Sequence, residues 1–539
     1  MRLGAIFSDG VILQRDKEIY VFGESDTSEE ISIEIDDIKV RIAVKPGRWS
    51  VKLPAHAAGG PYEMVVRGRD VITIKDILYG EVWIDNGQSN IEFELRNSLG
   101  GIEEIKNADY SDIRFFKSIK APVIDDAFLE EEKKLRWHKC REGDFQEMSG
   151  IGYFFAQKLH EYTGVPIGIV DCYQGGTSIS CWLQEEELNS IPEGRAYLEE
   201  FRSLTVGQSE DEYIKLLTDY NRMVETHLRL AEEARKNNPG ITPEELGEIA
   251  GDYPWPPPMG LRSAFRPGGL IESMIKRIAP FTSRGIIYYQ GEEDAVRNYE
   301  WCKADKALDD RNYKGMYQRL LEKLVIQYRE LFCDEALPVV IVQLPMYISR
   351  KDVDERKWAY IREAQERVYR EMDSMTLATL IDLGEYDNVH PVDKKSPGQR
   401  IASEVLKTVY SRDDVGSKHM TLSGVRRFDG GVVLEFENTY GGVVLMENEL
   451  VDIRQENTGN TKGHIYGFEI AVSNPDGTDA ISPVIWKVPD RISINRDTVI
   501  IYESGEIREV RYGFFDYGKV NVYNARCVPL APFRAGVSG

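Results

Sequence analysis

The sequence lacks long hydrophobic runs and has no excess of positive charge. No apolar stretch approaches the ~18 residues that a bilayer-spanning helix requires. The net charge of −23 argues against a nucleic-acid backbone or an anionic membrane surface as a partner. A neutral ligand is compatible with this charge, whereas a polyanionic one is less so.

Paired or closely spaced cysteines are also absent, because the six cysteines form no CxxC motif. We therefore predict buried thiols in a reducing compartment. The N-terminal stretch MRLGAIFSDGVILQRDKEIYVFG is interrupted by Asp9 and by Gln14-Arg15-Asp16, so it has no apolar core of a signal peptide. From these features we expect a cytoplasmic protein, provided that no leader precedes this sequence.

At 539 residues, 42% hydrophobic and 29% charged, the chain has the composition of a soluble globular protein with two to four domains. Residues 1–78 contain short alternating runs separated by turns, which predict an N-terminal β-sandwich-like domain. A similar pattern over residues 415–539 predicts a C-terminal one. The N-terminal runs are ISIEIDDIKVRIAV, WSVKLPA and YEMVVRG, and the C-terminal ones are GGVVLEFEN, HIYGFEIAVS, ISINRDTVIIYES, EIREVRYGFF and KVNVYNA.

Residues 79–410 have a different pattern, which predicts an α/β domain with a parallel sheet covered by helices. Almost continuously apolar strand candidates alternate there with helical stretches such as GIGYFFAQKLHEYTG and YKGMYQRLLEKLVIQYRELF. The strand candidates are EVWID, VPIGIVDC, SRGIIYYQG, LPVVIVQLP and MTLATLIDLG. A charged, helix-rich interval at about 185–258 is interpreted as an insertion. It is either a lid or wall over a site, or a solvated helical hairpin without a function.

Four of these strands are followed by polar or glycine-rich loops. Ligands of open α/β sheets bind at the carboxyl ends of the strands, so we expect the four loops to converge on one site. The loops are Gly87-Gln88-Ser89-Asn90, Tyr173-Gln174-Gly175-Gly176-Thr177, Gln290-Gly291-Glu292 and Glu385-Tyr386-Asp387-Asn388-Val389-His390-Pro391.

Chemical need assigns roles to three residues of these loops. A serine attacks well only when a base takes its proton, and histidine is the base suited to neutral pH. We therefore predict Ser89 as nucleophile and His390 as base. Asp387 precedes His390 by three residues, so its carboxylate is predicted to orient the imidazole through Nδ1.

An oxyanion that develops during attack needs preorganised donors. The candidates are the backbone N–H of Ser89, an N–H of Gly175 or Gly176, and the side-chain amide of Gln290. Each loop also has a simpler interpretation: Ser89 or Asn90 as a helix N-cap, the glycines as a turn, the Gln290 loop as a helix N-terminus with Glu292 favouring the dipole, and Asp387 and His390 as structural residues. No second histidine or cysteine lies near Asp387 and His390, so we expect no metal site there.

Taken in this order, the motifs resemble the sialate O-acetylesterase family of the SGNH hydrolase superfamily. The motifs are FSDGVILQRDKEIYVFG, GEVWIDNGQSN, VDCYQGGTSISCWL, RGIIYYQGEEDA, DLGEYDNVHP, YGFEIAV, VRYGFFDY and VYNARCVPLAPFR. The resemblance implies a three-layer α/β/α core with flanking β-domains. It also implies Ser89 as nucleophile, Asp387 and His390 as its partners, and Gln290 in place of the superfamily's usual oxyanion asparagine.

The resemblance further implies hydrolysis of O-acetyl esters on carbohydrates, with release of acetate and without a cofactor. Gln88, Asn90 and Glu292 are then expected to contact the substrate, an acetylated mono- or oligosaccharide. Glu293 and Asp294 depart from the family pattern, and if they line the pocket they disfavour an anionic sialic acid. Acetylated xylan- or xyloglucan-type oligosaccharides are therefore an alternative substrate, and an inactive carbohydrate-binding protein is an alternative of another class. We expect no nucleic-acid or membrane partner and leave a homo-oligomer open.

Overall fold

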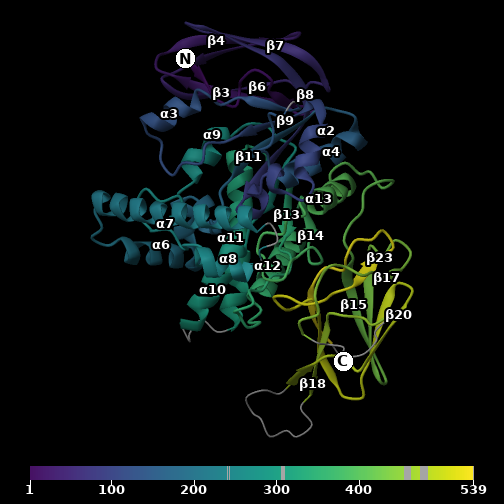
Figure 1. The fold of residues 1–539 in the computed structure, drawn as a ribbon. Coiled ribbons are helices and arrows are strands. Elements are labelled where there is room, and N and C mark those ends of the chain that lie inside the picture. The colour runs from purple at the N-terminus through teal and green to yellow at the C-terminus, as the bar shows by residue number, and fades with distance from the viewer. Residues whose placement is uncertain are drawn as a thin grey trace.

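A computed structural model describes residues 1–141, 143–238, 241, 243–304, 310–454, 463–473 and 484–537. The chain folds as a mixed α/β protein with several sheets, which confirms the α/β class (Figure 1). A purple N-terminal group of strands lies at the top of this view, a helix-rich middle below it, and a yellow-green C-terminal group of strands at the lower right. Among the described helices, none combines the length and hydropathy that a membrane span requires.

The N-terminal strands pair largely as the alternating pattern predicts. β3 pairs antiparallel with β1 and β6, while β4 pairs antiparallel with β5 and β7. Ile31, Ile33 and Ile35 of β4 are buried and alternate with more exposed residues, because successive side chains of a strand point to opposite faces. The strands are β1 (Arg2–Leu3), β2 (Ile12–Gln14), β3 (Ile19–Ser25), β4 (Glu29–Ile35), β5 (Ile38–Val44), β6 (Gly47–Leu53) and β7 (Gly59–Arg67).

A single long strand, β8 (Val71–Gly87), connects this region to the middle of the protein. Its first part pairs antiparallel with β7, and its last part lies between two parallel neighbours, β11 and β12. The boundary predicted between residues 78 and 79 therefore falls inside one continuous strand. Because this strand ends at Gly87, the first predicted site loop starts from the centre of the sheet.

The central sheet has the order β10-β9-β11-β8-β12-β13-β14. The pairs from β9 through β14 are parallel, and only the edge strand β10 is antiparallel. All five strands predicted for this region are present, whereas β9 and β10 were not predicted. The strands are β9 (Asp109–Lys117), β10 (Trp137–Arg141), β11 (Ile167–Tyr173), β12 (Gly285–Tyr289), β13 (Val339–Gln343) and β14 (Met375–Thr379).

Helices pack on and around this sheet. α4 and α13 contact each other and contact β11 and β14 respectively, while α11 packs on α12, which contacts β13 and β14. Both helical stretches singled out in the sequence are helices, α4 and α11. The helices outside the predicted insertion are α1 (Ser89–Glu92), α2 (Gly101–Asn107), α3 (Asp126–Glu132), α4 (Gly150–Thr163), α9 (Lys276–Ile278), α10 (Glu292–Ala304), α11 (Asp310–Leu331), α12 (Lys357–Glu371) and α13 (Lys395–Thr408).

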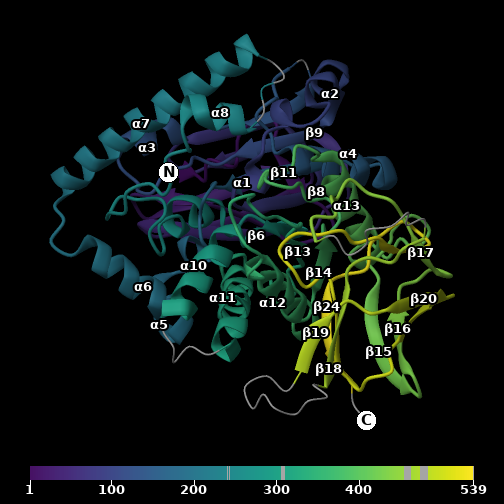
Figure 2. The same cartoon turned by 60° about the horizontal axis from the view of Figure 1, so that its bottom comes forward.

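The predicted insertion is helical, as expected. Its longest element, α7, begins with a capping box in which the Ser209 hydroxyl accepts from the Glu212 N–H and the Glu212 side chain accepts from the Ser209 N–H. Figure 2 shows α7 along the outer edge of the molecule. The helices are α5 (Glu185–Ser190), α6 (Pro192–Thr205), α7 (Glu210–Asn237) and α8 (Pro243–Ala250).

The C-terminal region contains two four-stranded antiparallel sheets, β15-β16-β21-β20 and β19-β18-β22-β24, and the pair β17-β23. Buried residues of both larger sheets, such as Leu434 and Ile470, share one hydrophobic cluster with Met346 and Ile381 of the central region. The strands are β15 (Thr421–Phe428), β16 (Gly431–Glu437), β17 (Val443–Leu445), β18 (Phe468–Ser473), β19 (Val484–Lys487), β20 (Arg491–Asn495), β21 (Thr498–Tyr502), β22 (Ile507–Tyr512), β23 (Val522–Asn524) and β24 (Phe533–Gly536).

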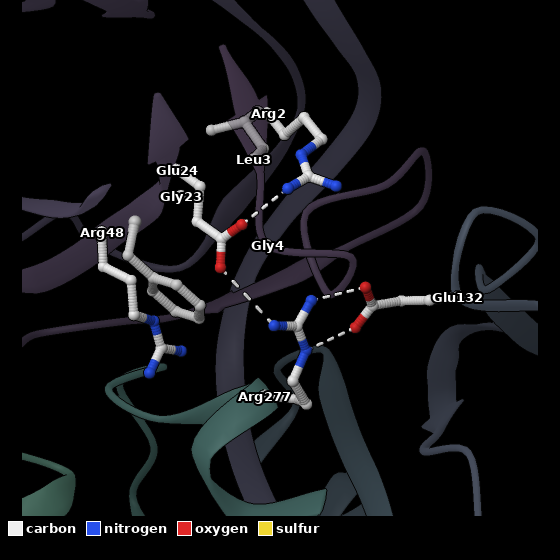
Figure 3. Close-up of a pocket in the computed structure, with 9 residues that line it drawn as sticks. Arg2, Leu3, Gly4, Gly23, Glu24, Arg48, Glu132 and Arg277 are labelled. Carbon is white, nitrogen blue, oxygen red and sulfur yellow. Dashed lines mark hydrogen bonds and ion pairs between the residues drawn. The ribbon is translucent and has the colours of Figure 1, made fainter. Parts of the chain in front are cut away.

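Ion pairs join the N-terminal sheet to the central region around a small cavity of about 40 Å³ (Figure 3). Arg277 pairs with Glu132 through two nitrogens, at 2.7 and 2.5 Å, and with Glu24 at 3.6 Å. Arg2 donates to the same Glu24 carboxylate at 2.8 Å. Because its charged lining is paired, this cavity is a junction between two sheets rather than a candidate site.

Two carboxylates lie opposite each other on the central strands β8 and β11. Asp85 and Asp171 are paired in register and are at most 1% exposed. Asp171 accepts from the Tyr173 hydroxyl at 2.8 Å, whereas neither Asp85 oxygen has a hydrogen-bond partner. Burial, reinforced by the Asp171 charge, raises the pKa of Asp85 well above its usual range. Burial raises the pKa of Asp171 to about 6.

This pair predicts a loss of stability with rising pH. The folded protein binds protons here more tightly than the unfolded chain, whose aspartates titrate near pH 3.9, so the free energy of unfolding falls as pH rises from about 4 through 6 and beyond. Asp85→Asn removes one of the two charges, and we expect it to flatten this decline between pH 5 and 8. Denaturant unfolding at several pH values measures the difference. Asp109→Asn, at an exposed position on β9, is the control, and an Asp85→Asn curve parallel to that of the wild type contradicts the interpretation.

Candidate active site

The end of β8 places a serine against a histidine from the far end of the domain. Gly87 has φ +135°, and a Cβ there would lie 2.0 Å from the Tyr289 carbonyl oxygen, so only glycine fits this turn. α1 begins immediately afterwards at Ser89. The Ser89 Oγ lies 2.8 Å from the His390 Nε2. The residues predicted as nucleophile and base are therefore within hydrogen-bond distance, although 301 positions separate them.

The protonation state of His390 suits a base. Burial, together with the nearby Lys394 charge, lowers the pKa of His390 to about 4. The imidazole is then neutral at neutral pH, and Nε2 can accept the Ser89 proton. The His390 backbone N–H donates to the Asn388 Oδ1 at 3.1 Å, which fixes the loop around the ring.

The predicted hydrogen bond between Asp387 and His390 is not formed in this structure. The Asp387 carboxylate instead accepts from the Arg350 backbone N–H at 2.9 Å and pairs with the Arg350 guanidinium. Asp387 has φ +59°, a conformation in which the carboxylate meets both donors of Arg350. Arg350 thus supplies two donors to the Asp387 carboxylate, and both hydrogen bonds are charge-assisted.

The glycine loop lies beside Ser89, but one of its amides is already in use. A Cβ added to Gly175 would lie 3.5 Å from the Ser89 Cβ. The Gly175 N–H donates to the Glu92 carboxylate, whose other oxygen pairs with Lys120. In the described part of the chain, neither the Gly176 N–H nor the Ser89 N–H has an acceptor. Of the four candidate oxyanion donors, the Ser89 and Gly176 N–H groups are thus available, and the Gly175 N–H is covered by a carboxylate that sequence reasoning did not identify.

Gln290, whose side chain is predicted as an oxyanion donor, has its hydrogen-bond partners inside the protein. Its side chain is fully buried, and its NH₂ group donates to the Gln88 Oε1 and to the Thr177 carbonyl, both at 3.1 Å, as well as to Asp294 at 2.5 Å. Its carbonyl oxygen accepts from the Tyr317 hydroxyl at 2.7 Å. An amide with its N–H groups engaged inside the protein joins the loops below the site rather than facing a substrate.

The three residues predicted to contact the substrate, Gln88, Asn90 and Glu292, are also internal, with at most 5% exposure. Asn90 Nδ2 donates to Glu292 at 2.8 Å and to the Val389 carbonyl at 3.0 Å. Lys394, which the sequence analysis did not single out, donates to the Asn90 Oδ1 at 2.7 Å. Hydrogen bonds within the protein take up these side chains in this structure, and their contact with a substrate stays a prediction.

Glu292 and Lys394 form a buried, oppositely charged pair around Asn90. Burial raises the pKa of Glu292 to about 7, and burial lowers the pKa of Lys394 to about 7. One Glu292 oxygen has no hydrogen-bond partner. The only sign of this pair in the sequence was the position of Lys394, four residues after His390 on the same loop.

The two acids that depart from the family pattern have partners within the protein. Glu293 pairs with Arg297 at 3.0 Å. Asp294 is fully buried and accepts from the Ile179 backbone N–H at 2.9 Å and from the Tyr197 hydroxyl. The condition under which they would disfavour an anionic sugar is therefore not met.

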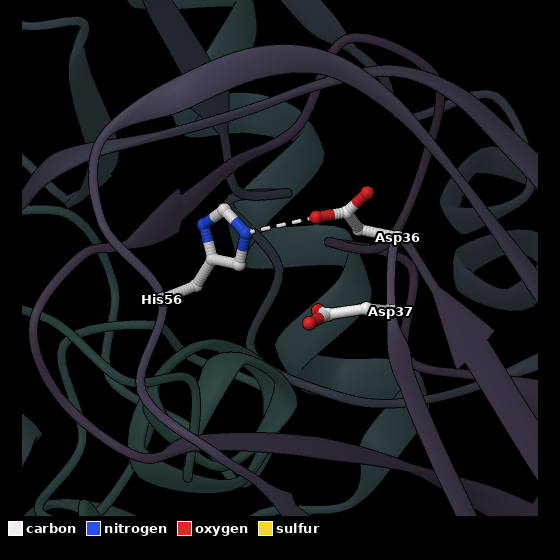
Figure 4. A group of neighbouring side chains, drawn as sticks. All are labelled: Asp36, Asp37 and His56. Carbon is white, nitrogen blue, oxygen red and sulfur yellow. Dashed lines mark hydrogen bonds and ion pairs between the residues drawn. The ribbon is translucent and has the colours of Figure 1, made fainter.

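Possible metal ligands gather far from Ser89, in the N-terminal region (Figure 4). Ligand atoms of Asp36, Asp37 and His56 lie within 4.8 Å of one another. His56 Nε2 is 3.3 Å from an Asp36 oxygen, its Nδ1 is 2.7 Å from the Ala57 carbonyl, and its ring stacks on Tyr79. Both aspartates are exposed, and nothing else in the structure indicates a bound ion there.

Comparisons with known proteins find similarity to carbohydrate esterases. A family model described as carbohydrate esterase, sialic acid-specific acetylesterase, matches residues 261–407, which include Gln290, Asp387 and His390. The sialate O-acetylesterase of Mus musculus is 23% identical over 404 residues, a match that covers 70% of this chain and 65% of the mouse protein. That of Rattus norvegicus is 22% identical over 530 residues, covering 91% of this chain and 84% of the rat protein.

A solved structure shares the whole fold. A carbohydrate acetylesterase from Xanthomonas citri superposes with a TM-score of 0.69 and 24% identity, covering 99% of each chain. The family resemblance that the sequence motifs indicated is confirmed by these findings. The chain is thus similar to the sialic acid-specific acetylesterases among the carbohydrate esterases, in sequence and in fold.

Proposed function

We propose that this protein hydrolyses O-acetyl esters on carbohydrates and releases acetate, with Ser89 as nucleophile and His390 as base. The observation that carries the proposal is the 2.8 Å contact between the Ser89 Oγ and the His390 Nε2 at the carboxyl end of the parallel sheet. The names of the relatives, sialate O-acetylesterase and carbohydrate acetylesterase, supply the ester and the class of alcohol.

In the first half of the reaction, Ser89 Oγ attacks the acetyl carbonyl carbon while Nε2 of His390 takes its proton. The C–O bond to the sugar then breaks, and the sugar oxygen leaves with the proton from His390. Water attacks the acetyl-serine in the second half, again with His390 as base. Acetate leaves, and the Ser89 hydroxyl is restored.

The oxyanion of each tetrahedral intermediate would be held by backbone amides. The Ser89 and Gly176 N–H groups have no acceptor in the described part of the chain, so they are the donors we propose. The Gly175 N–H joins them only when the Glu92 carboxylate moves away.

The architecture can be proposed in more detail than the α/β class alone. We propose an SGNH-type three-layer core flanked by β-sandwich-like domains at 1–78 and 415–539. Supporting it are the parallel order of the central sheet and the shared hydrophobic cluster of the two C-terminal sheets.

The substrate alternatives remain an acetylated sialic acid and neutral xylan- or xyloglucan-type oligosaccharides. Because Glu293 and Asp294 are paired internally, their charges give no reason to exclude the anionic sugar. An inactive carbohydrate-binding protein has no need of a serine hydroxyl hydrogen-bonded to a neutral histidine, so the enzyme is favoured.

Replacing the reacting residues tests this mechanism. We expect Ser89→Ala and His390→Ala to lower kcat/KM for acetate release by about 10³-fold or more. Asp387→Asn should cost less than about tenfold, because the Asp387 carboxylate contacts Arg350 rather than the imidazole. An orienting triad carboxylate costs ~10⁴-fold when changed to asparagine. A loss of that size in Asp387→Asn would show that the carboxylate turns to His390 during catalysis, and full activity in Ser89→Ala would refute the mechanism.

The pH profile gives a second test. With a His390 pKa of about 4, the base form persists at pH 5, so kcat/KM for a small acetate ester should stay at ~90% of its plateau there. A histidine with the ordinary pKa of about 6.5 would leave only ~3% of the plateau at pH 5. Circular dichroism at each pH controls for unfolding. An acid limb centred at pH 6.5 contradicts the low pKa.

Neutralising Glu92 tests whether its carboxylate keeps the Gly175 N–H from binding the oxyanion. Glu92→Gln removes the negative charge that competes with the oxyanion for the Gly175 N–H, and we expect kcat/KM for a small acetate ester to rise by about three- to tenfold. Glu94→Gln, which breaks contacts to Lys117 and Arg96 only, should leave the rate unchanged. A fall in the rate of Glu92→Gln would mean that the carboxylate supports the glycine loop instead of blocking it.

A further inference from the structure

An exposed tryptophan lies directly on the glycine loop. Trp255 follows α8 at the end of the insertion, and its side chain is 46% exposed. A Cβ added to Gly176 would come within 2.1 Å of the indole Cη2, so the ring covers the bare backbone of that glycine. Gly175, the preceding residue, borders Ser89. The indole is thus one residue further along the loop that flanks the nucleophile.

The indole is held in place from several directions. Phe265 packs edge-to-face against it, with ring centroids 5.6 Å apart and planes at 90°. The Tyr220 hydroxyl of α7 donates to the Pro254 carbonyl at 3.0 Å, immediately before Trp255. These contacts fix the ring while leaving almost half of its surface open to solvent, although burial of so large an aromatic is normally favourable.

The same segment reaches the other side of the site. Asp252 pairs with Lys351 at 3.2 Å, and the neighbouring Arg350 holds Asp387. Residues 252–255 therefore lie between the glycine loop and the loop that precedes α12. Of the two interpretations of the insertion, a wall of the site fits these contacts better than a solvated hairpin.

We propose that the exposed face of Trp255 is the platform on which the sugar ring of the substrate stacks while its acetyl group reaches Ser89. The ligand is a pyranose ring, whose C–H groups pack on the electron-rich face of an indole. This inference rests on the proposed function and deepens it. Trp255 is the only described tryptophan that is strongly exposed, and no other observation explains why it lies at the nucleophile.

The platform holds the sugar and takes no part in bond making. Its loss should therefore raise KM for substrates that contain a sugar ring and should leave the hydrolysis of a ring-free ester unchanged. This difference separates a binding residue from one that merely stabilises the glycine loop.

The test compares Trp255→Ala, Trp255→Phe and the wild type, all as full chains. The substrates are an O-acetylated sialic acid, an acetylated xylo-oligosaccharide and ethyl acetate, which has no ring. On the better sugar we expect Trp255→Ala to lose at least tenfold in kcat/KM, mainly through KM, and Trp255→Phe to lose less than threefold. Ethyl acetate should be hydrolysed within twofold of the wild-type rate. Val206→Ala, at an 83% exposed position of the insertion between α6 and α7, is the matched control.

Equal losses on the sugar and on ethyl acetate would overturn the platform and assign Trp255 a structural role, and so would unchanged kinetics on the sugar. A binding measurement keeps the two proposals apart. Adding the acetylated xylo-oligosaccharide or the O-acetylated sialic acid to Ser89→Ala should change its tryptophan fluorescence, and the change should vanish in Ser89→Ala/Trp255→Phe. If the wild type releases no acetate but this change is seen, the proposed function fails and the platform stands. If neither sugar changes the fluorescence, the platform fails.

Discussion

The active geometry depends on the Asn90 carboxamide, which joins two loops that are 299 residues apart. Asn90 follows Ser89, the proposed nucleophile, and its Nδ2 donates to the carbonyl of Val389, which precedes His390, the proposed base. Glu292 and Lys394 hold the same carboxamide from two sides. A buried polar network of this kind is stable only when its members are satisfied, so it permits few arrangements of the loops. The short contact between Ser89 and His390 is a consequence of this network.

Polar residues at the ends of strands serve two purposes here, and residue type does not distinguish them. Gln88, Gln290 and Asn90 look like substrate ligands in the sequence, yet their hydrogen bonds are internal and hold the loops together. Buried amides must find partners inside the protein because an unmade hydrogen bond is costly. Backbone N–H groups, which every residue except proline carries, are left as the donors that we propose for the oxyanion. Position relative to the sheet could be predicted, but the direction of each side chain depends on neighbours from other loops.

The sequence predicted the parts of the fold that hydrophobicity specifies. The five strand candidates of residues 79–410 are almost continuously apolar, and each is found, as the last part of β8 and as β11, β12, β13 and β14. β9 and β10 were missed because DYSDIRFFK and WHKCR mix charged and aromatic residues without a clear period. The pairing of Ser89 with His390 followed from chemistry and spacing along the sheet. The partner of Asp387 did not, since Arg350 comes from a different loop and its proximity is set by tertiary packing.

The insertion and the C-terminal region contact different loops of the site. Residues of the C-terminal region fix the loop after β13: the Asp516 carboxylate accepts from the Trp358 N–H at 2.7 Å, and the Asp516 carbonyl accepts from the Tyr347 N–H at 2.9 Å. That loop carries Arg350 and so sets the position of Asp387. The insertion brings Trp255 to the glycine loop, where it can meet the alcohol part of an ester. In the proposed mechanism the sheet supplies the reacting groups, and we infer that segments outside it select the sugar that reaches them. Changes within the insertion can then alter the substrate without disturbing the buried network that holds Ser89 and His390 together.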